Sequence, residues 1–82
     1  MFYFVYILKS SKDNRFYIGQ TNNLDDRINR HNTGQVIATR NRRPLQIVHT
    51  ETFASRAAAM KREKYLKSLK SSKYIVANII KM

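Results

Sequence analysis

The stretch FYFVYIL (residues 2–8) decides the fold. Its residues are aromatic or β-branched almost throughout, and the run is shorter than a typical helix. Apolar side chains at both odd and even positions indicate that both faces of the strand are covered. The stretch therefore predicts a central strand, with a neighbouring strand on each side and helices packed on the sheet.

A second strand is predicted where the chain reads RFYIG (residues 15–19), after a polar run at residues 9–14. The two strands form a hairpin. If its tip lies at Ser11-Lys12, residues whose numbers sum to 23 lie opposite one another, and Tyr6 faces Tyr17. A slip of one residue would send one ring to the other face. Paired strand tyrosines also occur as ordinary core residues, so this pairing alone does not identify a site.

A helix is predicted to begin near Leu24, after the capping residues 21–23. Leu24, Arg27, Ile28 and His31 follow i, i+3, i+4, i+7 spacing. An arginine and a histidine therefore lie beside the apolar stripe rather than opposite it. The alternatives are a surface arginine with a buried stem and a histidine that caps the end of the helix.

The helix ends at residues 32–34, and residues 35–44 form a basic loop that carries Arg40, Arg42 and Arg43. Arginine forks suit phosphate groups, so we expect these three side chains to bind nucleic acid. An exposed charged loop without a partner is the alternative.

A third strand is predicted over residues 45–52, and Ser55 is the expected cap of a helix that runs to about Leu69. His49 lies within the strand and is interpreted as a hydrogen-bonded filler. A last short helix is expected to follow Ser71-Ser72 and to close the core. The elements together predict an α/β (α+β) domain, a three-stranded antiparallel sheet flanked by helices.

Glu63 is the single acidic residue among many cations on the helix that follows Ser55. It flanks the apolar side of that helix, where it is a candidate metal ligand. The alternative is an i, i+4 partner for Lys67. Lys67 is itself a candidate nucleic-acid-binding residue. The position of Arg62 among the apolar residues has no explanation in the sequence.

The composition favours a nucleic-acid partner, because 16 Lys and Arg against 5 Asp and Glu give a net charge of +11. A solvated basic surface, or a ribosome-associated or protein-interaction domain, is the alternative. The length of 82 residues suits one domain, 1–82. The absence of cysteine fits a reducing cytoplasm. Residues 2–8 are too short to span a membrane and lack the features of a signal peptide.

Phosphodiester hydrolysis needs an activated water, a divalent cation and a positive charge on the phosphate. Tyr6 or Tyr17 could activate the water only if its pKa, near 10 in peptides, were lowered. Glu63 could hold one Mg²⁺ whose other ligands are waters and substrate oxygens. Arg27 would then bind the phosphate.

These residues, in the order FVY (4–6), YIG (17–19), Arg27, His31 and Glu63, resemble the GIY-YIG nuclease family over nearly the whole chain. The resemblance implies that both tyrosines, Arg27 and His31 line an active site and that Glu63 binds one divalent metal, Mg²⁺ or Mn²⁺. The expected function is a metal-dependent DNA endonuclease, in repair or recombination. We expect a monomer that works in the cytoplasm with no membrane contact, and with a protein partner as a source of targeting.

The sequence departs from the family at two positions that bear on the site. Phe4 replaces the first motif glycine, a substitution that the family accepts. Family nucleases usually carry a late asparagine, and at that offset from Glu63 this chain has Ile75, with Asn78 nearby. The competing hypothesis is therefore a non-catalytic, basic nucleic-acid-binding module with a degenerate GIY-YIG site.

Overall fold

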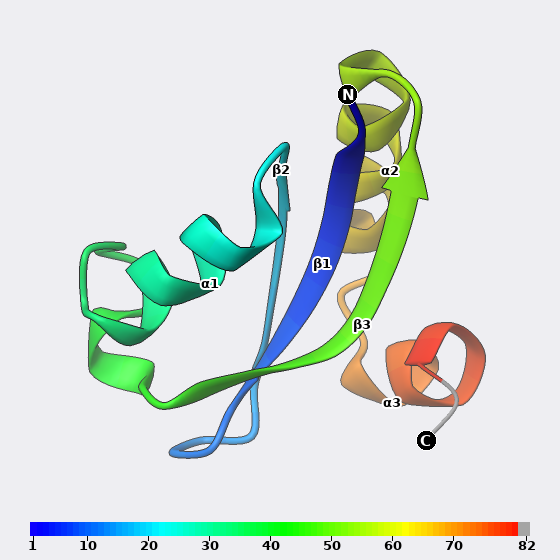
Figure 1. Ribbon diagram of the computed structural model, residues 1–82. Helices are drawn as coiled ribbons and strands as arrows, with labels where there is room; N and C mark the ends of the chain where they lie inside the picture. The colour runs from blue at the N-terminus through cyan, green and yellow to red at the C-terminus, as the bar shows by residue number, and fades with distance from the viewer. Residues whose placement is uncertain (81–82) are drawn as a thin grey trace.

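The computed structural model describes residues 1–80, which form a three-stranded antiparallel sheet with helices on both faces (Figure 1). The strands are β1 (Tyr3–Ser10), β2 (Phe16–Thr21) and β3 (Leu45–Phe53). Their order in the sheet is β2-β1-β3, so β1 pairs with both of the others. The predicted α+β fold and the central position of the first strand are confirmed.

The helices begin at the predicted capping residues. They are α1 (Leu24–Asn32), α2 (Arg56–Ser68) and the short α3 (Ser72–Tyr74), which continues as a π-helical segment, Ile75–Ile80. Asn23, Ser55 and Ser71 cap α1, α2 and α3 by accepting a backbone N–H. A 3₁₀ turn, Arg40–Arg42, lies in the basic loop. Within residues 1–80, every helix is too short or too polar to cross a membrane.

The two faces of β1 bury different residues. Val5 and Ile7 pack into a cluster that includes Leu66 of α2 and Ile75, whereas Tyr6 and Leu8 pack on the side where Leu24 and Ile28 of α1 lie. Figure 1 shows α1 and α2 on the two sides of the sheet. Because Val5, Tyr6, Ile7 and Leu8 are all fully buried, the apolar run at both parities was a correct indication of a strand covered on both faces.

The predicted hairpin register is wrong by two residues. Tyr6 pairs with Gly19, and Tyr17 pairs with Leu8. The cause lies in the turn: Ser10 N–H donates to the Arg15 carbonyl at 2.9 Å, and Asn14 has a φ of 59°. A shift of two residues preserves the alternation of side chains, so both tyrosines still lie on one face.

Arg62 pairs with Glu51 of β3, a contact that explains its position on the inner side of α2. Its guanidinium donates to both carboxylate oxygens of Glu51, at 2.8 and 3.0 Å, and the His49 ring lies 2.8 Å from the same carboxylate. Burial opposes ionisation of Glu51, but the hydrogen bonds from Arg62 and His49 hold its pKa below the usual value. His49 is thus a hydrogen-bonded filler, as predicted.

Candidate active site

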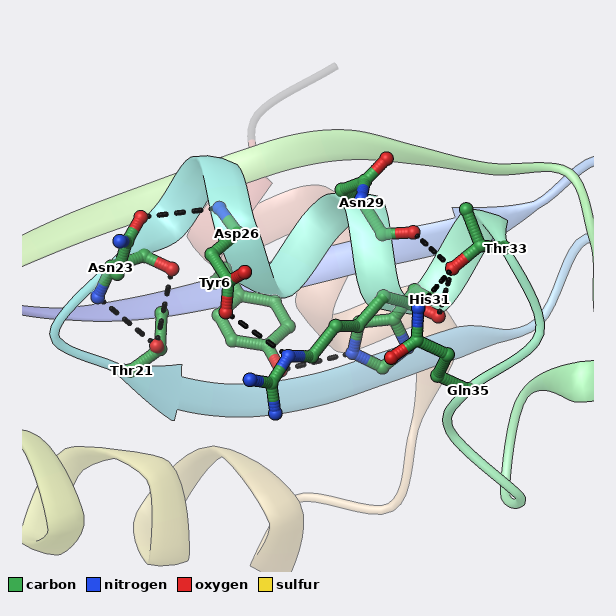
Figure 2. Close-up of polar contacts among 9 residues, drawn as sticks. Tyr6, Thr21, Asn23, Asp26, Asn29, His31, Thr33 and Gln35 are labelled. Atoms are coloured by element: carbon green, nitrogen blue, oxygen red, sulfur yellow. Dashed lines mark hydrogen bonds and ion pairs between the residues drawn. The ribbon is translucent and has the colours of Figure 1, made fainter.

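A buried chain of hydrogen bonds joins the sheet to α1 and the basic loop. The Tyr6 hydroxyl lies 3.1 Å from His31 Nε2, and His31 Nδ1 lies 2.8 Å from Thr39 Oγ1. Figure 2 shows the Tyr6 phenol reaching His31 across the gap between β1 and α1. A phenol is a stronger donor than an aliphatic hydroxyl, so we assign Tyr6 O–H as the donor to Nε2 and Nδ1–H as the donor to Thr39.

Tyr6, His31 and Thr39 are all fully buried. The Tyr6 ring lies against the backbone of Gly19, where an added Cβ would come within 2.6 Å of the ring atom Cζ and closer still to Oη. In the structure, Gly19 makes room for the Tyr6 ring.

The buried chain of hydrogen bonds is held in its neutral form. Burial raises the pKa of Tyr6 to about 12, with a further contribution from Tyr17, and the positive charge of Arg27 only partly offsets this rise. Burial also lowers the pKa of His31, and the nearby Arg27 lowers it further. A phenol with this pKa is a poor general base near neutral pH.

Tyr17 lies next to this buried set of hydrogen-bonded side chains and is itself half-buried. Its ring centroid lies 4.9 Å from that of His31, at an interplanar angle of 62°, and 6.5 Å from that of Tyr6. Arg27 and Glu63 are also partly exposed, and the charges of both act on Tyr6. Tyr17, Arg27 and Glu63 are thus partly exposed residues that each act on the buried Tyr6, and we call these three the solvent-facing layer of the site.

The predicted metal ligand Glu63 is paired with Lys67, whose Nζ lies 3.4 Å from Glu63 Oε2. The i, i+4 alternative is thus present in the structure. No group of three or more His, Asp or Glu side chains suited to a metal occurs anywhere in residues 1–80. A single carboxylate fits Mg²⁺, which keeps most of its waters and takes further ligands from substrate phosphates, but does not fit a metal held wholly by protein groups.

The arginines of the basic loop make local contacts instead of joining the tyrosine cluster. Arg40 donates to the Gly34 carbonyl at 2.9 Å, Arg43 donates to the Arg40 carbonyl at 2.8 Å, and Arg42 is paired with Asp13 at 3.3 Å. Their contact with nucleic acid stays a prediction. The loop also supplies Thr39, the partner of His31, which sequence reasoning missed because no periodic signal marks a buried threonine in an arginine-rich loop.

Ile75 and Asn78 are the two positions that the sequence offers for the late asparagine of the family. Ile75 is buried in the core cluster, 5% exposed. Asn78 is exposed, and its side-chain amide donates at 3.1 Å to the Tyr74 carbonyl in its own helical segment.

The raised Tyr6 pKa predicts a loss of stability in alkali. The folded pKa lies above the ordinary value of 10, so this contribution is complete below about pH 10 and is lost as the pH rises towards about 12. A difference of two pKa units corresponds to about 2 to 3 kcal/mol in the free energy of unfolding.

Urea unfolding from about pH 8 to about pH 11 should show a steeper decline for the wild type than for Tyr6→Phe, which has no phenol to ionise. The substitution itself should cost about 1 to 3 kcal/mol at neutral pH, because His31 Nε2 loses its donor. If the stability of the two proteins fell in parallel as the pH rises, the raised pKa of Tyr6 would be contradicted.

Comparison with known proteins identifies the family to which the chain belongs. The family profile described as "GIY-YIG catalytic domain" matches residues 2–75. The chain is 43% identical over 72 residues to the UPF0213 protein NP_0776A of Natronomonas pharaonis, covering 87% of this chain and 84% of that protein. It is 39% identical over 72 residues to the UPF0213 protein YazA of Bacillus subtilis, covering 87% of this chain and 72% of YazA.

A solved structure is also similar, the solution NMR structure of the UPF0213 protein BH0048 from Bacillus halodurans. It shares 34% identity and a TM-score of 0.47, with 95% of each chain covered. The profile match extends from the first strand through Glu63 to Ile75 and so includes every residue of the candidate site. The chain belongs to the GIY-YIG nuclease family.

Proposed function

We propose that this protein is a metal-dependent endonuclease that hydrolyses phosphodiester bonds in DNA. The observation that carries the proposal is the solvent-facing layer, in which a tyrosine, an arginine and a carboxylate lie over a buried Tyr6–His31 support. These are the groups that phosphodiester hydrolysis requires. The net charge of +11 supports a polyanionic substrate.

Arg27 would bind the non-bridging oxygens of the scissile phosphate with its guanidinium fork. Glu63 would hold Mg²⁺ or Mn²⁺. A cation bound there would neutralise the negative charge that develops on the phosphate. Tyr17 would orient the attacking water. The water oxygen would bond to phosphorus as the bond to the leaving sugar oxygen breaks, while the water gives up a proton to bulk solvent and the leaving oxygen takes one from solvent.

Tyr6 and His31 have a positioning role in this proposal, because both are fully buried and neither reaches substrate. Tyr6 supports the His31 ring, and the His31 ring supports the edge of Tyr17. Of the two tyrosines, Tyr17 is therefore the one that would contact the attacking water. A monomer acting in the cytoplasm, with a separate protein for targeting, stays part of the proposal.

The second candidate is a basic nucleic-acid-binding module without catalysis. The buried Ile75 in place of a polar residue is the specific observation that favours it. This candidate predicts metal-independent binding that weakens steeply with salt and no cleavage of any DNA.

The test uses nicked, supercoiled and branched DNA with Mg²⁺ or Mn²⁺. Arg27→Ala should reduce cleavage by about 10²- to 10³-fold, since a charged donor to the transition state is lost. Tyr17→Phe should also reduce cleavage. The matched control is Arg30→Ala on the same helix, which removes only an exposed pair with Asp26. Equal losses for Arg27→Ala and Arg30→Ala would show that Arg27 acts through general charge alone.

A further inference from the structure

Thr39 uses its hydroxyl group on a distant ring rather than on the turn that it begins. It stands at the N-terminal cap position of the 3₁₀ turn Arg40–Arg42, where a threonine hydroxyl commonly accepts a backbone N–H. It makes no such bond here. Instead, Thr39 is fully buried and its Oγ1 lies 2.8 Å from His31 Nδ1. The turn therefore does not explain a threonine at this position, whereas the imidazole does.

The basic loop holds Thr39 in place through contacts that do not involve His31. Thr39 N–H donates to the Val36 carbonyl at 3.1 Å, and Arg42 N–H donates to the Thr39 carbonyl at 2.9 Å. The Ser10 hydroxyl of β1 in turn donates to the Arg42 carbonyl. The position of Thr39 Oγ1 is thus set by the loop, so this oxygen can orient the His31 ring.

The proton positions in the set Tyr6–His31–Thr39 follow from what each group can accept. Arg27 acts on the Tyr6 hydroxyl as a charge and as a hydrogen-bond donor, and a guanidinium offers no acceptor for the phenol proton. The Tyr6 proton therefore points at His31 Nε2, 3.1 Å away, which must then carry no proton. A neutral imidazole with a bare Nε2 carries its proton on Nδ1. That N–H is buried and needs the acceptor that Thr39 provides.

We propose that Thr39 is a positioning residue of the site, which fixes His31 as the Nδ1–H tautomer and thereby turns the lone pairs of the Tyr6 oxygen towards Arg27. This inference rests on the proposed function, in which Arg27 binds the scissile phosphate. A guanidinium held on a defined oxygen presents its other N–H groups in a defined direction, because the fork is planar and rigid. In the other tautomer, the phenol proton would face Arg27, and the two donors would repel each other.

Long-range ¹H–¹⁵N NMR spectra of the imidazole test the first step without any substrate, because they identify which ring nitrogen carries the proton. We expect wild-type His31 to carry it on Nδ1 near neutral pH. Thr39→Val keeps the size of the side chain but removes the acceptor, so the proton should move to Nε2, where the Tyr6 oxygen can accept it. Thr39→Ser keeps a hydroxyl group and should keep the wild-type tautomer.

Cleavage kinetics test the second step. Thr39→Val should lower kcat by about 10- to 10²-fold and change KM by less than about twofold, because a misdirected Arg27 fails in the transition state more than in DNA binding. Thr39→Ser should recover most of the wild-type kcat. A rescue of this kind requires the hydroxyl group itself rather than the volume of the side chain.

The matched control is Thr21→Val, which removes another buried threonine hydroxyl, one that is bonded to the backbone of Asn23. It should lower the free energy of unfolding as Thr39→Val does, yet leave the His31 proton on Nδ1. Its kcat should fall by less than about threefold. His49 serves as an internal reference in the NMR spectra, because its ring lies against Glu51 and should not respond to either substitution.

A wild-type spectrum with the His31 proton on Nε2 would overturn the inference, and this result does not depend on whether Thr39→Val folds. Equal effects of Thr39→Val and Thr21→Val on kcat, or an unchanged kcat despite a change of tautomer, would also overturn it. If the wild type cuts no DNA, the proposed catalysis is rejected. The spectra of the wild type, Thr39→Val and Thr39→Ser would still decide whether Thr39 fixes the His31 ring.

Discussion

Gly19→Ala should both destabilise the protein and reduce its cleavage activity. The added methyl group would lie 2.6 Å from Tyr6 Cζ, so the ring must move away from β2 and from its position beside His31. Overpacking of a core typically costs about 1 to 3 kcal/mol, which urea unfolding would measure. Cleavage should fall by about 10²-fold, because displacement of a supporting ring misplaces the groups in front of it.

A double-mutant cycle separates this cause from a general weakening of β2. Tyr6→Leu removes the ring atoms that the alanine methyl group would contact. The Tyr6→Leu substitution should therefore lower the free energy of unfolding less when Gly19→Ala is already present than it does in the wild type. Gln20→Ala, at the next position of the same strand, is the control and should leave the tyrosine cluster undisturbed. Strict additivity of Gly19→Ala and Tyr6→Leu would contradict the proposed contact.

Glu63→Gln should abolish most cleavage and leave the fold intact. Glutamine keeps the size of the side chain but loses the charge that a divalent cation requires. We expect a loss of about 10²- to 10³-fold in the cleavage rate. The ion pair with Lys67 is a partly exposed i, i+4 pair at 3.4 Å, so its loss should change stability by no more than about 0.5 kcal/mol.

Asp25→Asn provides the matched control for Glu63→Gln. It also removes one carboxylate, from the exposed first turn of α1. Cleavage by Asp25→Asn should stay close to that of the wild type. A similar loss in both variants would show that net charge, rather than a metal ligand, explains the effect.

The strands and the helix ends could be predicted from sequence because their signals are local. The apolar run of residues 2–8 specifies a covered strand, and Asn23, Ser55 and Ser71 supply the caps that begin three helices. Alternation along a strand also placed Tyr6 and Tyr17 on one face correctly, because an error of two residues in the register leaves each side chain on the same face of the sheet.

What the sequence could not supply are contacts between distant segments. The hairpin register depends on the conformation of Asn14. The role of Arg62 depends on Glu51, which comes within its reach only when α2 packs back on β3. Thr39 likewise becomes a partner of His31 only when the basic loop folds back on α1. None of these contacts leaves a periodic pattern along the chain.

The candidate site was predicted as a set of residues but not as two layers. Sequence spacing treats Tyr6 and Tyr17 as equivalent, whereas the structure buries the first and leaves the second partly exposed. Burial depends on how closely α1 packs on the sheet, which the spacing does not specify. This difference leads us to assign contact with the attacking water to Tyr17.

The most direct test of the account is cleavage of branched and single-stranded DNA by the wild type and Glu63→Gln, with Mg²⁺, with Mn²⁺ and with EDTA. We expect the wild type to cut when either metal is present and to stop in EDTA. Glu63→Gln should bind DNA with similar affinity but not cut it. Cleavage that is equal in the two proteins, or that persists in EDTA, would contradict the account.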